Sequence, residues 1–335
     1  MSTIINNNLI SDNLVVIKNI TSSFCKWGLD NTFILIQYID IPYLIYASKS
    51  KSIISYNLKE ENINTEIKNA HKSVVTSFRY YYQNINKRHI IMSIAGEKNN
   101  IKLWDFSNWS CIINILNIYE FGLLFSSCFL NENNIDDSIL TSSSSSENGI
   151  KIYDFSGNFI KLVNGSNDKT LFIDSFYDEI NSKLYIITGN DGYAKSYDYM
   201  ENKLYHKYIE DGDSWHCSIK INKSQNILKL IDSCWKDDFL RIWDFHSGIL
   251  LSKIKTYGKN IKSIFLYNED YLFIGCYDHS IRLIDIKNEK YVTSYIGHKY
   301  WVCTINKVLL PTYGECLISQ GLGSDEMIKI WVNID

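Results

Sequence analysis

The fold of this chain is decided by one stretch, Phe239-Leu240-Arg241-Ile242-Trp243-Asp244-Phe245. Its aliphatic residues at 240 and 242 alternate with charged or aromatic neighbours, and it closes on an aromatic residue followed by Asp. A period of two residues sends successive side chains to opposite faces of a β-strand, whereas a helix needs a period of about 3.6. The stretch therefore predicts a half-buried β-strand.

The chain repeats this strand along its length. Close copies occupy residues 101–105, 150–154, 281–285 and 328–332, and weaker copies occupy 53–57 and 193–198. The Asp place falls at 57, 105, 154, 198, 244, 285 and 332, which gives steps of 48, 49, 44, 46, 41 and 47 residues. A period of about 40 to 50 residues, with a strand ending in Trp-Asp, is typical of a propeller of four-stranded blades.

The seven copies make the chain similar to the WD-repeat family over essentially its whole length. The resemblance implies an all-β fold, a seven-bladed β-propeller of four-stranded antiparallel blades, in a single domain over residues 1–335. Residues 9–20 are expected to form a strand before the first repeat, and the last repeat stops without an outer strand. The resemblance implies that this N-terminal strand joins the last blade, which removes two open sheet edges.

Composition narrows the classes of partner. The net charge is −3, and Arg79, Arg88, Arg241 and Arg282 are the only arginines, so we expect no nucleic acid as a partner. No signal peptide is visible, and no apolar run reaches the roughly 18 residues of a membrane span, so we expect no membrane partner. The eight cysteines include no Cys-x-x-Cys pair, which favours free thiols in the cytoplasm, with the nucleus as the alternative.

The sequence lacks the motifs that catalysis or cofactor binding would require. No two of the seven histidines stand at His-x-x-x-His spacing, which leaves a metal site without support. Neither a P-loop nor a Gly-x-Gly-x-x-Gly or Gly-x-Ser-x-Gly motif occurs, although each carries a specific phosphate site or nucleophile. We therefore expect no enzyme activity, no cofactor and no metal.

The resemblance also implies a buried hydrogen-bond network within blades. In WD-repeat proteins it links a His before the first strand, a Ser or Thr on the second strand, an Asp in the next turn, and the Trp. The most complete set lies in blade seven: His298, Ser319, Asp325 and Trp331. Blade two supplies His71, Ser93 and Trp104 with Lys98 in the Asp place, and blade five supplies Ser233, Asp237 and Trp243 without a His.

A further implication concerns the narrow face of the propeller, a frequent contact surface in the family. Seven residues at or beside the starts of first strands form the candidate partner-binding set: Phe33, Phe172, Trp215, Trp301, Tyr300, Asp174 and Lys262. Exposed aromatic residues ringed by polar groups are typical of interaction hot spots. The alternative is that these residues simply cap the ends of packed blades.

Two functions follow as hypotheses. The first is a non-catalytic scaffold, a monomeric propeller within a hetero-complex, which presents one face to partner proteins. The alternative is a reader of short modified peptides at the central opening. A reader needs an aromatic cage or several cations that converge, and Phe172, Trp215 and Trp301 supply a cage only if they meet.

Overall fold

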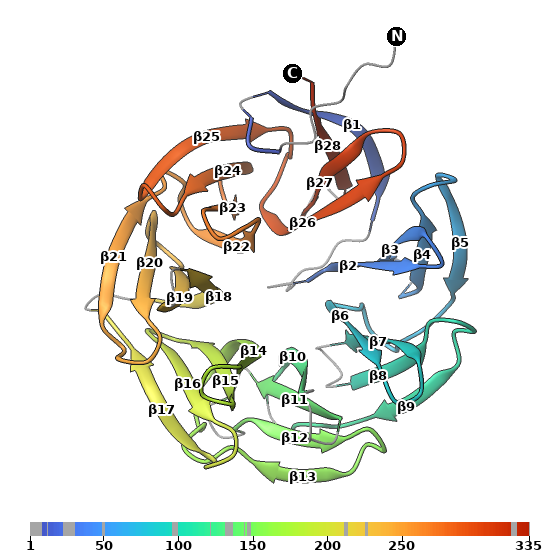
Figure 1. Cartoon of the computed structure of the whole chain (residues 1–335). Helices are drawn as coiled ribbons and strands as arrows, with labels where there is room; N and C mark the ends of the chain where they lie inside the picture. The colour runs from blue at the N-terminus through green and yellow to red at the C-terminus, as the bar shows by residue number, and fades with distance from the viewer. Residues whose placement is uncertain are drawn as a thin grey trace.

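A ring of seven four-stranded antiparallel sheets forms the molecule, as the sequence predicts (Figure 1). This computed structural model describes residues 9–11, 13–22, 31–48, 51–95, 100–120, 122–130, 137–143, 145, 149–210, 214–224, 227–322 and 327–334. Within these ranges, no helix is long and apolar enough to cross a membrane.

Each blade is a meander in which consecutive strands pair. Blade one holds β2 (Phe33–Tyr38), β3 (Ile41–Ala47), β4 (Ile53–Asn57) and β5 (Asn62–Ile67). Blade two holds β6 (Ser77–Gln83), β7 (Arg88–Ala95), β8 (Asn100–Asp105) and β9 (Cys111–Ile115). Blade three holds β10 (Leu124–Leu130), β11 (Ser138–Ser143), β12 (Lys151–Asp154) and β13 (Phe159–Leu162). Blade four holds β14 (Thr170–Asp178), β15 (Lys183–Asn190), β16 (Ala194–Asp198) and β17 (Lys203–Tyr208).

The remaining blades follow the same order. Blade five holds β18 (His216–Ser224), β19 (Ile227–Cys234), β20 (Phe239–Asp244) and β21 (Leu250–Lys255). Blade six holds β22 (Ile261–Leu266), β23 (Tyr271–Cys276), β24 (Ser280–Asp285) and β25 (Lys290–Ile296). Blade seven holds β26 (Val302–Leu310), β27 (Gly314–Gly321) and β28 (Met327–Asn333), and its outer strand is β1 (Leu14–Thr21).

The ring closes through the N-terminal strand, which confirms the expectation from the sequence. Strand β1 pairs antiparallel with β28, with Val15 opposite Val332 and Asn19 opposite Lys329. A buried hydrogen bond also crosses from blade one to blade seven, because the Thr32 hydroxyl donates to Gln320 Oε1 at 2.5 Å. The outer edge of β28 and the side of blade one that faces blade seven are therefore both covered.

The core lies between neighbouring blades. Between blades four and five it contains Phe172, Tyr185, Tyr208, Trp243 and Phe245, each at most 3% exposed. Blades approach one another closely enough that some positions exclude a Cβ. A Cβ on Gly189 in β15 would lie 2.1 Å from the carbonyl oxygen of His216 in the next blade, so only glycine fits there.

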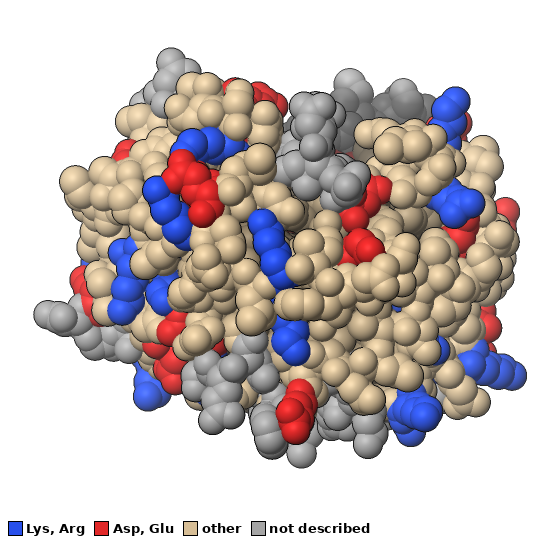
Figure 2. Space-filling model, turned by 90° about the horizontal axis from the view of Figure 1, so that it is seen from below, with Lys and Arg blue, Asp and Glu red and all other residues tan. Residues whose placement is uncertain are grey.

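The meander places two kinds of loop on the same flat face of the propeller: the turns between second and third strands, and the connections between blades. We call this face the connection face. On this face an isolated β-bridge joins Asp191, in the turn between the second and third strands of blade four, to Trp215, in the connection to blade five. On the side of the ring around β13, Figure 2 shows acidic and basic side chains interspersed over a mostly uncharged surface.

Candidate functional site

Five aromatic side chains meet on the connection face of blades five to seven, and we call them the aromatic cluster: Trp215, Trp235, Tyr277, Tyr300 and Trp301. Trp235 lies at the centre, with ring centroids 6.0 Å from Trp215 and 6.2 Å from Trp301. Tyr277 and Tyr300 both stack on Trp301, at 4.4 and 5.0 Å. Offset and edge contacts at these distances are the preferred geometries of aromatic pairs.

Tight loops on three blades position these rings. Trp215 and Trp301 directly precede β18 and β26, whereas Trp235 and Tyr277 directly follow β19 and β23. The Trp235 amide donates to the Trp215 carbonyl at 2.7 Å, which joins the two loops of blade five. Because backbone bonds of this kind fix the loop ends, the rings are held by the strands of the blades.

Lys262, in β22, lies beneath the aromatic cluster and is 5% exposed. Its Nζ is 3.3 Å from the centre of the Trp235 ring and 5.2 Å from that of Trp301. Burial lowers the pKa of Lys262 to about 8, although the nearby Cys217 and Cys303 thiols oppose the shift. A cation on an aromatic face adds about 0.5–2 kcal/mol of attraction, so Lys262 helps to hold the rings in place.

The outer side of the aromatic cluster faces solvent. Trp215 is 38% exposed and Tyr277 is 37% exposed, while Tyr300 and Trp301 are half-buried. Lys169 Nζ lies 4.5 Å from the centre of the Trp215 ring. The exposed Lys236, Lys259 and Lys299 stand in the same loops and form no ion pair within the described part of the chain. Two neighbouring carboxylates are held, because Asp237 binds Arg241 and Asp278 binds Arg282, both at 2.6 Å. The exposed Asp191, which bridges to Trp215, forms no ion pair with another described residue. The surface is thus aromatic, with charges of both signs at its edge.

The structure brings together four of the seven residues predicted for partner binding: Trp215, Tyr300, Trp301 and Lys262. Phe33 and Phe172 are each 1% exposed, which corrects the expectation that they reach a partner. Strand starts at these positions lie against the adjacent blade, where Phe172 packs with Tyr185 and Trp243. Asp174 is half-buried in a separate cavity of about 210 Å³ beside Phe172, away from the aromatic cluster.

Sequence reasoning missed Trp235 and Tyr277. Both stand in turns after second strands. The predicted contact surface consisted of residues at or beside the starts of first strands. A signal for them exists, since each follows a buried cysteine at the end of its strand, Cys234 and Cys276.

The predicted hydrogen-bond network is present in two blades. In blade seven, Trp331 Nε1 donates to Ser319 Oγ at 2.8 Å, and His298 Nε2 lies 2.7 Å from the same oxygen. In blade two, Trp104 Nε1 donates to Ser93 Oγ at 2.8 Å, and His71 Nε2 lies 2.7 Å from it. Asp325, the expected fourth member in blade seven, lies outside the described residues.

Two details of this network differ from expectation. In blade two the partner of His71 Nδ1 is Asn100 Oδ1 at 2.5 Å, a residue that the sequence pattern did not identify. In blade five Asp237 binds Arg241, and the buried indole N–H of Trp243 has no acceptor among the described residues. The Ser233 hydroxyl donates instead to the Ser218 carbonyl at 3.3 Å. Blade five is held instead by apolar packing and by a buried pair between its first two strands, in which His216 Nδ1 lies 2.8 Å from the Asp232 carboxylate.

The described residues contain no group of three His, Cys, Asp or Glu side chains arranged to hold a metal ion. The aromatic cluster is a partly exposed, mainly apolar surface. Its chemistry is apolar and cation–π contact.

Comparison with known proteins gives one distant relative and no family assignment. No protein-family profile matches the chain. A segment of 106 residues, 32% of this chain, is 26% identical to the U3 small nucleolar RNA-associated protein 21 homolog of Schizosaccharomyces pombe. The matched segment covers 11% of that protein, so the chain aligns with only a small part of it.

Proposed function

We propose that this chain is a WD-repeat propeller that acts as a non-catalytic scaffold, a subunit of a larger assembly that contacts partner proteins through the aromatic cluster. The observation that carries the proposal is the set of stacked rings that three blades hold at the surface, with Trp215 and Tyr277 more than a third exposed. Rigid aromatic side chains bury a large area on binding and lose little side-chain entropy, so they dominate many interfaces.

The rings of the aromatic cluster indicate the kind of partner segment. Three blades hold them at the surface, with Trp215 and Tyr277 the most exposed. We therefore propose a segment with an apolar or aromatic anchor. The anchor would supply most of the affinity.

The relative adds limited support. Its name states an association with a small nucleolar RNA, which fits a protein that works with other macromolecules. Because the match covers a small part of that protein, its partners are not assigned to this chain. We also propose a reducing compartment, the cytoplasm or alternatively the nucleus, which the seven free cysteines of the described ranges support.

The alternative function, recognition of short modified peptides at the central opening, stays a prediction. One observation weighs against recognition through an aromatic cage. Lys262 already places an ammonium 3.3 Å from the centre of the Trp235 ring. A methylated lysine at this ring would have to displace an internal cation. Phe172, the third ring of the hypothetical cage, is buried in the core between blades four and five.

The test is affinity purification of the tagged full-length chain from its own cells, followed by quantitative mass spectrometry. The informative variant is Trp215→Ala with Tyr277→Ala, because both rings are exposed and their loss leaves the core intact. We expect wild type to recover a reproducible set of subunits. Recovery should fall about tenfold or more in the variant, as expected when two hot-spot residues are truncated.

The matched control removes two exposed aromatic rings elsewhere, Phe159→Ala in β13 with Tyr313→Ala in the turn after β26. This control should recover the same subunits as wild type. A folded Trp215/Tyr277 variant with undiminished recovery would show that the aromatic cluster is not the contact face. A wild-type chain that purifies alone would contradict the scaffold itself.

A further inference from the structure

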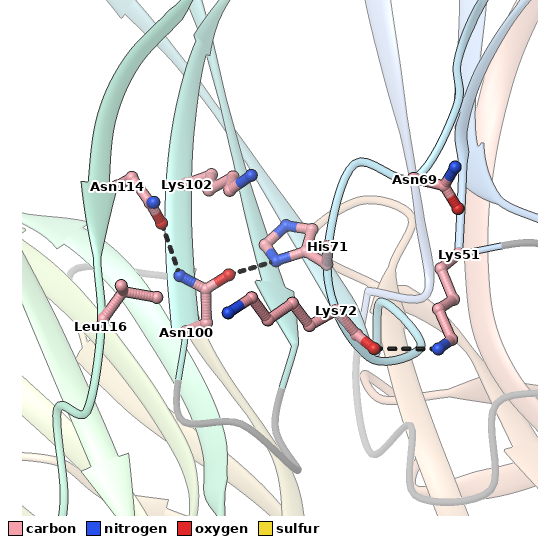
Figure 3. A pocket seen from close by; sticks show the side chains of 8 residues that line it. All are labelled: Lys51, Asn69, His71, Lys72, Asn100, Lys102, Asn114 and Leu116. Atoms are coloured by element: carbon pink, nitrogen blue, oxygen red, sulfur yellow. Dashed lines mark hydrogen bonds between the residues drawn. The ribbon is translucent and has the colours of Figure 1, made fainter.

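A second site lies across the ring from the aromatic cluster, on the connection face between blades one and two (Figure 3). It is a cavity of about 570 Å³ lined by Lys51, Asn69, His71, Lys72, Asn100, Lys102, Asn114 and Leu116. Three of these residues are lysines, three are asparagines and none is acidic. In Figure 3 the Lys72 and Lys102 ammonium groups lie on the side of Asn100 and Asn114, whereas the Lys51 ammonium lies at the Lys72 carbonyl, away from them. Cations and amides that line a concave site favour an anionic ligand.

Lys102 belongs to a position that recurs in the third strand of the blades, two residues before the aromatic place. In blades four, five and six the equivalent cation is neutralised, by the ion pairs Lys195–Asp168, Arg241–Asp237 and Arg282–Asp278. Lys102 instead donates to the Ala70 carbonyl at 2.6 Å, and it forms no ion pair within the described ranges. Lys151 in blade three likewise donates to a connection carbonyl, that of Ile118 at 2.7 Å, and Lys329 in blade seven donates to Asn19 Oδ1. Blades two, three and seven thus retain at this position a positive charge that blades four, five and six cancel.

The sequence explains this difference. In blades five and six an Asp stands four residues before the cation, at 237 and 278, whereas blade two has Lys98 there. Among the described residues that line the cavity, none carries a carboxylate.

Lys51 and Lys72 add two more charges. Both are exposed, and Lys51 Nζ donates to the Lys72 carbonyl at 2.9 Å, which brings the two chain segments together. Neither forms an ion pair with another described residue. An ammonium has three N–H donors, so Lys51 and Lys102 each keep two for a ligand after their bonds to carbonyl groups.

The wall behind the lysines is polar, rigid and uncharged. Asn100 Nδ2 donates to Asn114 Oδ1 at 2.8 Å and to the Ile115 carbonyl at 2.9 Å, so its Oδ1 faces His71 Nδ1. Burial lowers the pKa of His71 to about 4, with the hydrogen bond to Asn100 opposing the shift and the Lys102 ammonium adding to it. His71 is therefore neutral at physiological pH, and the positive charge of the site comes from the lysines.

We propose that this cavity binds a phosphate monoester. The Lys72 and Lys102 ammonium groups match a ligand group of about −1.5 to −2 charge better than a single carboxylate, and lysine binds phosphate as a point charge. The cavity is larger than a phosphate group, so it also accommodates the attached portion, with Leu116 as an apolar contact. The ester belongs either to a phosphorylated side chain of a protein or to a free nucleotide.

Isothermal titration calorimetry on the full-length chain tests the proposal with three probes: inorganic phosphate, a phosphoserine peptide and adenosine monophosphate. Sulfate and the unphosphorylated peptide serve as reference ligands. Wild type should bind at least one ester more tightly than sulfate. The variant Lys51→Glu with Lys72→Glu should weaken that binding about tenfold or more, because charge reversal replaces attraction by repulsion. Both residues are exposed, so this variant should fold.

The matched control is Lys59→Glu, an exposed lysine in the turn between β4 and β5 at the opposite end of blade one. It should bind as wild type does. Preference for the peptide identifies a phosphoprotein partner, and preference for the nucleotide identifies a free ligand; either outcome supports the site. No binding of any probe by wild type overturns the proposal, and so does unchanged affinity in the Lys51/Lys72 variant. Neither failure affects the aromatic cluster.

Discussion

Two equivalent tryptophans differ at the residue scale by one hydrogen bond. Trp331 donates to Ser319 Oγ at 2.8 Å, whereas the indole N–H of Trp243 has no acceptor among the described residues. Both rings are at most 3% exposed, so Trp→Phe removes a similar volume at each. We expect Trp331→Phe to lower the free energy of unfolding by about 1–3 kcal/mol more than Trp243→Phe, as measured by equilibrium urea denaturation.

The Ala variants of the same residues separate packing from hydrogen bonding. Trp331→Ala and Trp243→Ala should each cost about 3–5 kcal/mol, because either change empties a large buried volume. Equal losses in the two Phe variants would mean that the bond to Ser319 adds no net stability. A larger loss of unfolding free energy in Trp243→Phe than in Trp331→Phe would contradict the prediction more strongly.

His71 makes stability depend on pH. Its folded-state pKa is lowered to about 4, mainly by burial, while an unfolded chain has a value near 6.5. Between these values the unfolded state binds more protons, so stability present above pH 6.5 is lost as the pH falls towards 4. The loss from this residue approaches about 3 kcal/mol. Denaturation of wild type and His71→Gln between pH 7 and 4 measures it, and identical pH slopes would refute it.

Positions in the repeat predict part of the candidate site. The alignment of first strands identifies Trp215 and Trp301, because both precede a strand whose period is clear. Trp235 and Tyr277 stand in turns, where no periodicity marks the direction of a side chain. The charge state of Lys262 could not be predicted either, because its shifted pKa depends on burial beneath rings from other blades.

At the scale of the elements, the repeated strand predicts most of the secondary structure. The third strands end at the expected Asp places, as in β8 at Asp105 and β20 at Asp244. First strands are less well predicted: β6 begins at Ser77, three residues after the expected Val74. Burial of Phe33 and Phe172 depends on contact between blades, and the pattern of a single strand holds no information about that contact.

Close contact between blades leads to a prediction about Gly189. A Cβ at this place would lie 2.1 Å from a backbone carbonyl of blade five, so Gly189→Ala requires the two blades to separate. We expect a loss of about 3 kcal/mol in the free energy of unfolding. The control is Gly165→Ala, where nothing lies within 4 Å of the added atom but φ is +73°. It should cost only about 1 kcal/mol, and an equal or larger loss there would contradict close packing at Gly189.

At the scale of the whole molecule, stability depends on closure. Each blade packs only on its neighbours, so an opened ring would expose one side of blade one, one side of blade seven and the edge of β28. The latch is β1, whose seven partner pairs with β28 are supported by Ile20, 6% exposed in the core between blades seven and one. The sequence predicts this pairing because the last repeat supplies only three strands, so the N-terminal strand has to supply the fourth.

The latch can be tested with two substitutions in the same strand. Ile20→Asp places a carboxylate without a partner in the core, which costs about 3 kcal/mol or more, whereas Ile17 is 37% exposed and Ile17→Asp keeps its charge in water. We expect Ile20→Asp to lower the melting temperature of the entire propeller in one transition, because seven blades share one closed ring. Ile17→Asp should melt as wild type does.

Exposed β28 edges should also make the Ile20→Asp chain associate on heating, which light scattering detects. Equal melting of the two variants, or loss of blade seven alone in hydrogen exchange, would mean that the ring does not depend on this strand.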